Sequence, residues 1–112
     1  MKIIEVLPND IFTECHRLLI TGSRLIDVTY AAKGFAGDVS LKYIFISGSE
    51  AECVEVRTHL KSTVQSISSL CVSATYYENV IRDMTGIHFE GLEQDYGRRF
   101  LIAGEVIESV VE

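Results

Sequence analysis

The segment VSLKYIFIS, residues 39–47, decides how the rest of the chain is interpreted. Apolar side chains occupy both faces that a strand would present here, with Leu41, Tyr43 and Phe45 on one side and Ile44 and Ile46 on the other. A strand that is apolar on both faces is usually central in its sheet. We therefore expect residues 39–47 to form a middle strand with a neighbour on each side.

Two flanking segments supply the neighbours. Residues 24–32 alternate apolar Ile26, Val28 and Tyr30 with polar Asp27 and Thr29, and residues 52–60 are also strand-like. The connections, residues 33–38 and 48–50, are short and rich in turn residues. Short connections favour an antiparallel meander. Residues 1–7 are expected to form a short strand or an extended lead.

A helix is predicted on each side of the meander. In residues 9–21, Asn9 is the expected N-cap, and Gly22 supplies the left-handed residue that ends helices. Its apolar face is expected at Ile11, Cys15, Leu18 and Leu19.

The second helical region is expected to begin at Ser66, as N-cap, and to end at Gly86, with Ile87 folding back. Glu78 and Arg82 stand at i and i+4, the spacing of a helical ion pair. Residues 89–97 are expected to be irregular and residues 98–102 to form a short extended piece. The apolar stripe predicted to cover the sheet is Ile67, Leu70, Cys71, Ala74, Tyr77, Ile81 and Met84.

These patterns predict one α+β domain over residues 1–112. It would have an N-terminal helix, an antiparallel sheet meander of three to four strands, a second helix packed on the sheet and an irregular C-terminal segment. The length leaves no room for two full cores, and 47% hydrophobic with 23% charged residues is an ordinary globular balance.

Charge and hydropathy exclude several classes of function. Sixteen acidic residues against ten basic ones give a net charge of −6, which disfavours nucleic acids and anionic membrane surfaces as partners. No run approaches the roughly 20 apolar residues of a membrane span, and residues 1–10 are too acidic for a signal peptide. We expect a cytoplasmic protein that meets a membrane only through a partner.

Catalytic and metal-binding patterns are weak. Cys15, Cys53 and Cys71 form no Cys-x-x-Cys pair, so neither a disulfide framework nor a zinc site is indicated. Three histidines, His16, His59 and His88, sit in unlike contexts outside any catalytic motif. Cys53 and His59 share a strand face but would stand roughly 20 Å apart. We expect the chain alone to bind no metal or cofactor and to have no redox activity.

Residues 76–91 carry the strongest signal. The stretch YYENVIRDMTGIHFEG resembles the signature of the thirty-kilodalton subunit family of NADH–quinone oxidoreductase, respiratory complex I, and of related hydrogenase components. Tyr76 stands where the family usually has tryptophan, and Val80 and Thr85 replace a glutamate and a phenylalanine. The residues that match in order are Tyr77, Glu78, Asp83, Met84, Gly86, Ile87, Phe89, Gly91, Arg98 and Arg99.

The resemblance implies a non-catalytic assembly subunit that packs beside a large subunit. Its expected parent is a membrane-bound, complex-I-like [NiFe] hydrogenase, of the energy-converting or formate hydrogenlyase type, an expectation drawn from chain length; the thirty-kilodalton subunit of NADH–quinone oxidoreductase is the alternative. The [NiFe] centre or iron–sulfur clusters would lie in the large and small partner subunits, on the inner face of the cell membrane. Partner contacts are expected at Tyr76, Tyr77, Glu78, Asp83, Arg98 and Arg99, and structural roles at Gly86, Ile87, Phe89 and Gly91.

Asp83 is expected to need a cationic partner, because it lies at the negative end of its helix. Arg98 and Arg99 are the candidates. Glu78 would pair with Arg82 or face the partner subunit. A less favoured alternative is a small stand-alone enzyme or ligand-binding domain, with a cleft near Cys53, His59 and the end of the second helix.

Overall fold

A computed structural model gives the fold and describes residues 1–33 and 37–92. Within these residues the chain forms two helices and six strands, and their order fits the predicted α+β class. In chain order they are β1 (Lys2–Val6), α1 (Ile11–Ile20), β2 (Arg24–Lys33), β3 (Asp38–Ser47), β4 (Glu50–His59), β5 (Thr63–Gln65), α2 (Val72–Thr85) and β6 (His88–Glu90).

The main sheet has the strand order β1-β4-β3-β2. β3 pairs antiparallel with both β2 and β4, so the predicted meander with residues 39–47 in its middle is confirmed. β1 joins β4 in parallel, which makes the sheet mixed and not purely antiparallel. The chain leaves β1 and passes through α1 and two strands before β4, and so long a connection permits parallel pairing.

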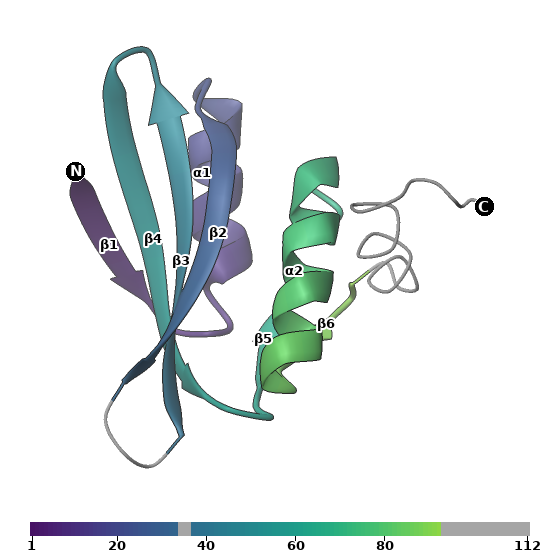
Figure 1. The fold of residues 1–112 in the computed structure, drawn as a ribbon. Coiled ribbons are helices and arrows are strands. Elements are labelled where there is room, and N and C mark those ends of the chain that lie inside the picture. Colours follow the sequence, from purple (N-terminus) through teal and green to yellow (C-terminus); the bar gives the residue numbers. More distant parts are fainter. Residues whose placement is uncertain (34–36, 93–112) are drawn as a thin grey trace, which may run out of the picture.

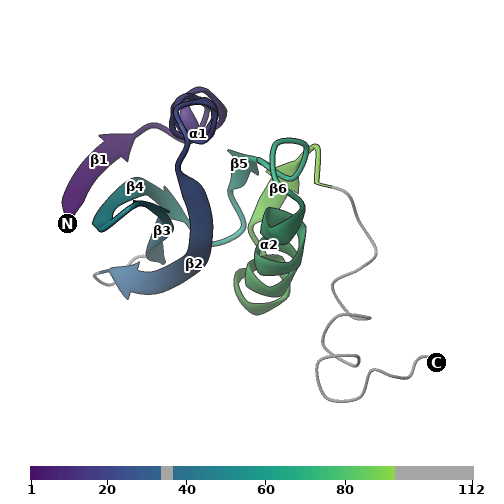
Figure 2. The same cartoon turned by 90° about the horizontal axis from the view of Figure 1, so that it is seen from above.

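One face of this sheet forms the core. Leu41, Tyr43 and Phe45 of β3 and Val54 and Val56 of β4 have no exposed surface. α1 lies against the sheet, and α2 runs alongside β2, on the side of the sheet away from β1 (Figures 1 and 2). α1 contributes the buried residues Ile11, Cys15 and Leu18, as its apolar spacing predicted.

A β-bulge changes the predicted pattern of β2. The register with β3 shifts between Leu25 and Asp27. The extra residue in a bulge lies outside the regular alternation of a strand. Val28 is therefore buried while Ile26 is exposed, although strict alternation places both on one face.

α1 begins one residue later than predicted. Asp10, not Asn9, is the N-cap, and its side chain makes no capping hydrogen bond. The amide of Asp10 instead donates to the carbonyl of Leu7 at 2.8 Å, which closes a turn around Pro8 before the helix starts. The end of α1 is as predicted, because Gly22 follows with φ of 103°.

The segment before α2 is not helical. β5 pairs in parallel with β6, and the amide of Ser66 donates to the carbonyl of Glu90 at 2.9 Å. Ser66 is thus not an N-cap; α2 begins after Cys71, and its predicted stripe residue Met84 is exposed. The expectation of an irregular segment from Phe89 is wrong for β6, because this pairing joins residues far apart in sequence. Residues 93–112 lie outside the described part of the chain.

Gly86 ends α2 as predicted. Its φ is 79°, and its amide donates to the carbonyl of Arg82 at 2.9 Å. The chain then folds back so that Ile87 is fully buried. A Cβ atom at position 86 would lie 3.1 Å from Cγ of Lys61. Both the left-handed backbone and this contact therefore favour glycine.

We expect Gly86→Val to lower the free energy of unfolding by more than about 1 kcal/mol, because a β-branched residue is strained at positive φ. Urea unfolding of the purified chain measures this. Gly86→Asn is the control, since asparagine tolerates the left-handed region better and should cost less. Equal unfolding midpoints for wild type and Gly86→Val would contradict this account of the helix end.

Candidate functional site

A buried carboxylate lies at the centre of the signature stretch. Glu78 of α2 has no exposed surface. Its Oε2 accepts the Tyr43 hydroxyl at 2.6 Å and the amide of Ile67 at 3.1 Å, and its Oε1 accepts the Ser66 hydroxyl at 2.6 Å. One side chain therefore joins α2 to the central strand β3 and to the segment that follows β5.

Ser66 extends this cluster toward β6. Its hydroxyl oxygen accepts the amide of Ser68 at 2.9 Å, and the Ser68 hydroxyl donates to the carbonyl of Gly91 at 3.4 Å. Gly91 has φ of 86° and directly follows β6. The polar cluster thus also holds the end of the small β5–β6 sheet.

Burial controls the ionisation of these groups. It raises the pKa of Glu78, and the hydrogen bonds from Ser66, Tyr43 and Ile67 offset part of that rise. Burial, together with the nearby Glu78 carboxylate, also raises the pKa of Tyr43 and of Cys15. A buried thiol with a raised pKa is a poor nucleophile, so this cluster suits a structural role better than a catalytic one.

The expected pair between Glu78 and Arg82 does not form. Glu78 is enclosed in the core, whereas the Arg82 guanidinium lies 3.3 Å from the carboxylate of Asp83. Asp83 thus does have a cationic neighbour, but a different one from those expected. Arg98 and Arg99 lie outside the described residues.

The outward side of α2 carries exposed apolar and aromatic groups. Val72 is 87% exposed and Met84 is 65% exposed, with Tyr76 at 38% between them. The Tyr77 ring packs edge-on against Tyr76, with centroids 5.7 Å apart, and its hydroxyl donates to the carbonyl of Ile26 at 3.2 Å. We call Val72, Tyr76, Tyr77 and Met84 the α2 patch. Exposed apolar and aromatic side chains along one helix are a feature of many interfaces.

The signature residues therefore divide into two groups. Tyr76 and Asp83 are exposed and Tyr77 is half-buried, whereas Glu78 faces the interior. The expected structural residues hold the turn and the core: Gly86 caps α2, Gly91 makes the turn after β6, and Ile87 and Phe89 are buried.

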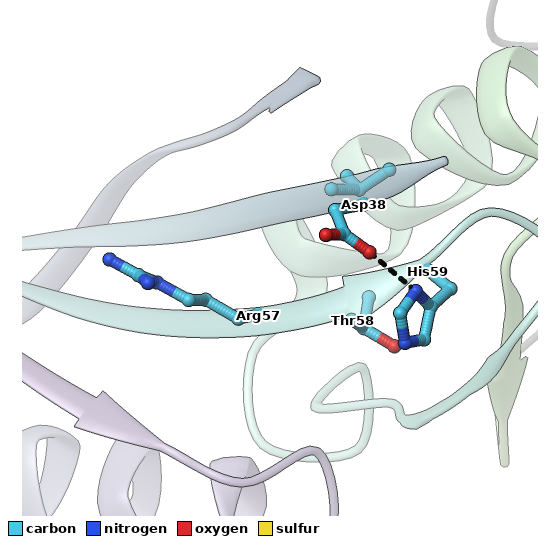
Figure 3. A pocket seen from close by; sticks show the side chains of 5 residues that line it. Asp38, Arg57, Thr58 and His59 are labelled. Carbon is cyan, nitrogen blue, oxygen red and sulfur yellow. Dashed lines mark ion pairs between the residues drawn. The ribbon is translucent and has the colours of Figure 1, made fainter. Parts of the chain in front are cut away.

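The alternative cleft does not bring its expected residues together. A surface hollow of about 190 Å³ is lined by Asp38, Val39, Arg57, Thr58 and His59 (Figure 3). His59 Nδ1 lies 2.7 Å from Asp38 Oδ1, across the β3–β4 pair. Cys53 does not line this hollow; it is buried, and burial raises the pKa of its thiol. In the described ranges, no three Cys, His, Asp or Glu side chains are grouped to hold a metal.

Sequence reasoning missed the partners of Glu78. The signal for Tyr43 was present, because a tyrosine on an otherwise apolar strand face needs a partner for its hydroxyl. The local sequence predicts a helix cap at Ser66, and nothing near it indicates a contact with a side chain twelve residues later.

Comparison with known proteins supports the resemblance seen in residues 76–91. A family model described as "Respiratory-chain NADH dehydrogenase, 30 Kd subunit" matches residues 4–108. A comparison with curated proteins finds no match. Within residues 1–33 and 37–92, no helix is long and apolar enough to cross a membrane.

We expect Glu78→Ala to lower the free energy of unfolding by about 2–4 kcal/mol, because it removes the acceptor shared by three buried donors. Glu78→Gln is the matched control and should cost only about 1 kcal/mol, since its carbonyl still accepts and its amide can donate to a hydroxyl. Urea unfolding of wild type and both variants measures these losses of unfolding free energy. Equal losses would contradict a role based on these hydrogen bonds.

The raised pKa of Glu78 also predicts a pH dependence. The folded state holds this proton more tightly than the unfolded state, so the contribution of Glu78 is complete at low pH and is lost as pH rises through the raised pKa. The stability of wild type relative to Glu78→Gln should therefore fall as pH rises over the range above about pH 4.3, the ordinary pKa of a glutamate. A difference that stays constant over this range would contradict the raised pKa. Glu50→Gln, at an exposed position, is the control.

Proposed function

The chain belongs to the respiratory-chain NADH dehydrogenase 30 Kd subunit family, and from that membership we propose that it is a non-catalytic assembly subunit docking beside a large subunit. Membership makes it a subunit of a complex-I-like oxidoreductase. The finer proposal is a parent complex of the [NiFe] hydrogenase type, energy-converting or formate hydrogenlyase-like.

The α2 patch is the observation that carries the docking proposal. It combines Tyr76 and Tyr77 with apolar Val72 and Met84 on a helix that Glu78 fixes to the sheet. Tyrosine and methionine are enriched at interfaces, because they combine a large contact area with adaptable polar or soft groups. A patch on a rigid helix loses little conformational entropy when a partner binds.

The description of the matching family also supports a second candidate for the parent complex. The matching family is described as a subunit of NADH dehydrogenase, which favours an NADH–quinone oxidoreductase as the alternative parent. A stand-alone enzyme has less support, because Cys53 is buried away from the hollow that contains His59.

The redox groups of the complex belong to its other subunits in this proposal. The [NiFe] centre or iron–sulfur clusters would sit in the hydrogenase-type large subunit and the iron–sulfur small subunit. The chain would lie on the inner face of the cell membrane through these partners. Its charge of −6 supports attachment through protein and not through anionic lipid.

Affinity purification of the tagged chain from its native membranes tests the proposal. We expect large and small oxidoreductase subunits to co-purify, and a [NiFe] centre or NADH oxidation in the recovered complex distinguishes the two parents. Recovery of the chain without any oxidoreductase subunit would contradict the proposed function.

Variants of the α2 patch test where the large subunit docks. Tyr76→Ser combined with Met84→Ser should reduce recovery of the large subunit at least about tenfold, because a loss of roughly 1.4 kcal/mol of binding free energy has that effect. Ile20→Ser is the matched control, since Ile20 is 69% exposed at the end of α1 and outside the patch. Equal recovery of the large subunit with the patch variant and with the control would contradict docking through the α2 patch.

A further inference from the structure

The serine hydroxyls beside Glu78 carry fewer hydrogens than their contacts need. Three contacts follow one another: Glu78 Oε1 to Ser66 Oγ at 2.6 Å, Ser66 Oγ to Ser68 Oγ at 2.9 Å, and Ser68 Oγ to the carbonyl of Gly91 at 3.4 Å. Each contact needs one hydrogen between its two oxygens, and each hydroxyl has only one to give. The two serines therefore supply two hydrogens for three contacts. A proton on Glu78 supplies the third.

The protonated form of Glu78 uses every polar position of this cluster. Oε2 accepts the Tyr43 hydroxyl and the Ile67 amide, as a carbonyl oxygen with two lone pairs does. Oε1 then carries the proton and donates it to Ser66, since a contact between two oxygens can be donated from either side. Ser66 Oγ in turn donates to Ser68 Oγ and also accepts the Ser68 amide at 2.9 Å, which fills its one donor and two acceptor positions.

The surroundings of Glu78 offer no positive charge to balance its ionised form. Among the ion pairs of the described residues none includes Glu78, and the Arg82 guanidinium lies beside another carboxylate. The titratable groups that face Glu78 are Tyr43 on β3 and Cys15 on α1. Burial raises the pKa of both, so both stay neutral. Residues 66–68 add hydroxyl and amide groups but no titratable side chain. Hydrogen bonds alone therefore hold the carboxylate when it is charged.

The three contacts form a hydrogen-bond chain that joins α2 to the end of β6. Glu78 stands in the middle of α2, and Gly91 directly follows β6, a strand of three residues beside the helix (Figure 1). When Glu78 loses its proton, Ser66 must donate to Oε1, and the single hydrogen of Ser68 reaches either Ser66 or Gly91. One contact of the chain is then lost. Ionisation of Glu78 therefore disconnects the helix from the turn at Gly91.

From these contacts we propose that Glu78 is a pH-sensitive switch, whose proton completes the hydrogen-bond chain to Gly91 and whose loss to water at higher pH opens it. The raised pKa of Glu78 agrees with this assignment. The α2 patch lies on the same helix, so a partner docks more firmly when the chain of hydrogen bonds is complete. The inference rests on the proposed function only for this last step.

Infrared spectroscopy of the purified chain detects the proton, because a neutral carboxylic acid and a carboxylate absorb at different frequencies. The spectrum is recorded about one pH unit above the ordinary glutamate pKa of about 4.3, where exposed glutamates are mostly ionised. The difference between wild type and Glu78→Gln should contain the band of one neutral acid, which disappears as the pH is raised. Glu50→Gln, at an exposed position, should retain that band. Absence of the band from wild type at the starting pH would overturn the proposal.

Hydrogen exchange measures whether the hydrogen-bond chain opens. Exchange of the amides of residues 88–92, divided by their intrinsic rates, should become several-fold faster in wild type as the pH rises. Glu78→Gln should remove this pH dependence, because its side-chain amide donates to Ser66 at every pH. The same pH dependence in wild type and Glu78→Gln would overturn the proposal.

Serine variants keep the exchange test decisive if Glu78→Gln does not fold. Ser68→Ala removes the link to Gly91 and should give fast, pH-independent exchange of residues 88–92. Ser69→Ala is the matched control, since Ser69 is exposed and adjacent in the chain, and it should behave like wild type. A pH dependence in Ser68→Ala equal to that in Ser69→Ala would overturn the proposal.

Washing the purified complex at increasing pH tests the effect on docking. The wild-type chain should release the large subunit several-fold faster at high pH than the Glu78→Gln chain does. Equal release from the two complexes at every pH would overturn the control of docking by Glu78. If purification recovers no oxidoreductase subunit, the proposed function fails, and the infrared and exchange measurements on the chain alone still decide whether Glu78 is a switch.

Discussion

The position of α2 depends on the carboxylate of Glu78. A carboxyl group loses its hydration when it is buried, and it stays buried only if donors in the protein replace water. Tyr43, Ser66 and the amide of Ile67 supply these donors from two separate parts of the chain. Because all three must converge on one group, α2 has one favourable placement against β3. Apolar packing alone specifies such a placement less sharply, since apolar contacts have little directionality.

This constraint gives the cluster of polar and aromatic residues in 76–91 two separate functions. Glu78 points into the core and fixes the helix there, while Tyr76 and Met84 on the same helix remain exposed. Tyr77 belongs to both groups, because its ring contacts Tyr76 and its hydroxyl reaches the bulge at Ile26. A helix that is fixed on one side and exposed on the other is suited to binding a partner.

The two edges of the main sheet also differ in whether another element covers them. Its β2 edge is occupied by α2, whereas the β1 edge ends the sheet with apolar Ile3 and Leu7 in contact with solvent. β1 and α2 lie at opposite edges of the main sheet, with α2 beside β2 (Figure 2).

Local signals in the sequence are enough to predict the meander, both helices and the turn at Gly86. Residues 39–47 are apolar on both faces, α1 has helical spacing, and a left-handed helix end calls for glycine. The sequence also identified the family, through contiguous residues around Glu78. Three features are visible only in the folded chain: Glu78 turns inward to Tyr43 and away from Arg82, β5 pairs with β6, and β1 runs parallel to β4. These features join residues far apart in the chain, and a hydrogen bond between distant residues leaves no periodic pattern in the sequence of either one.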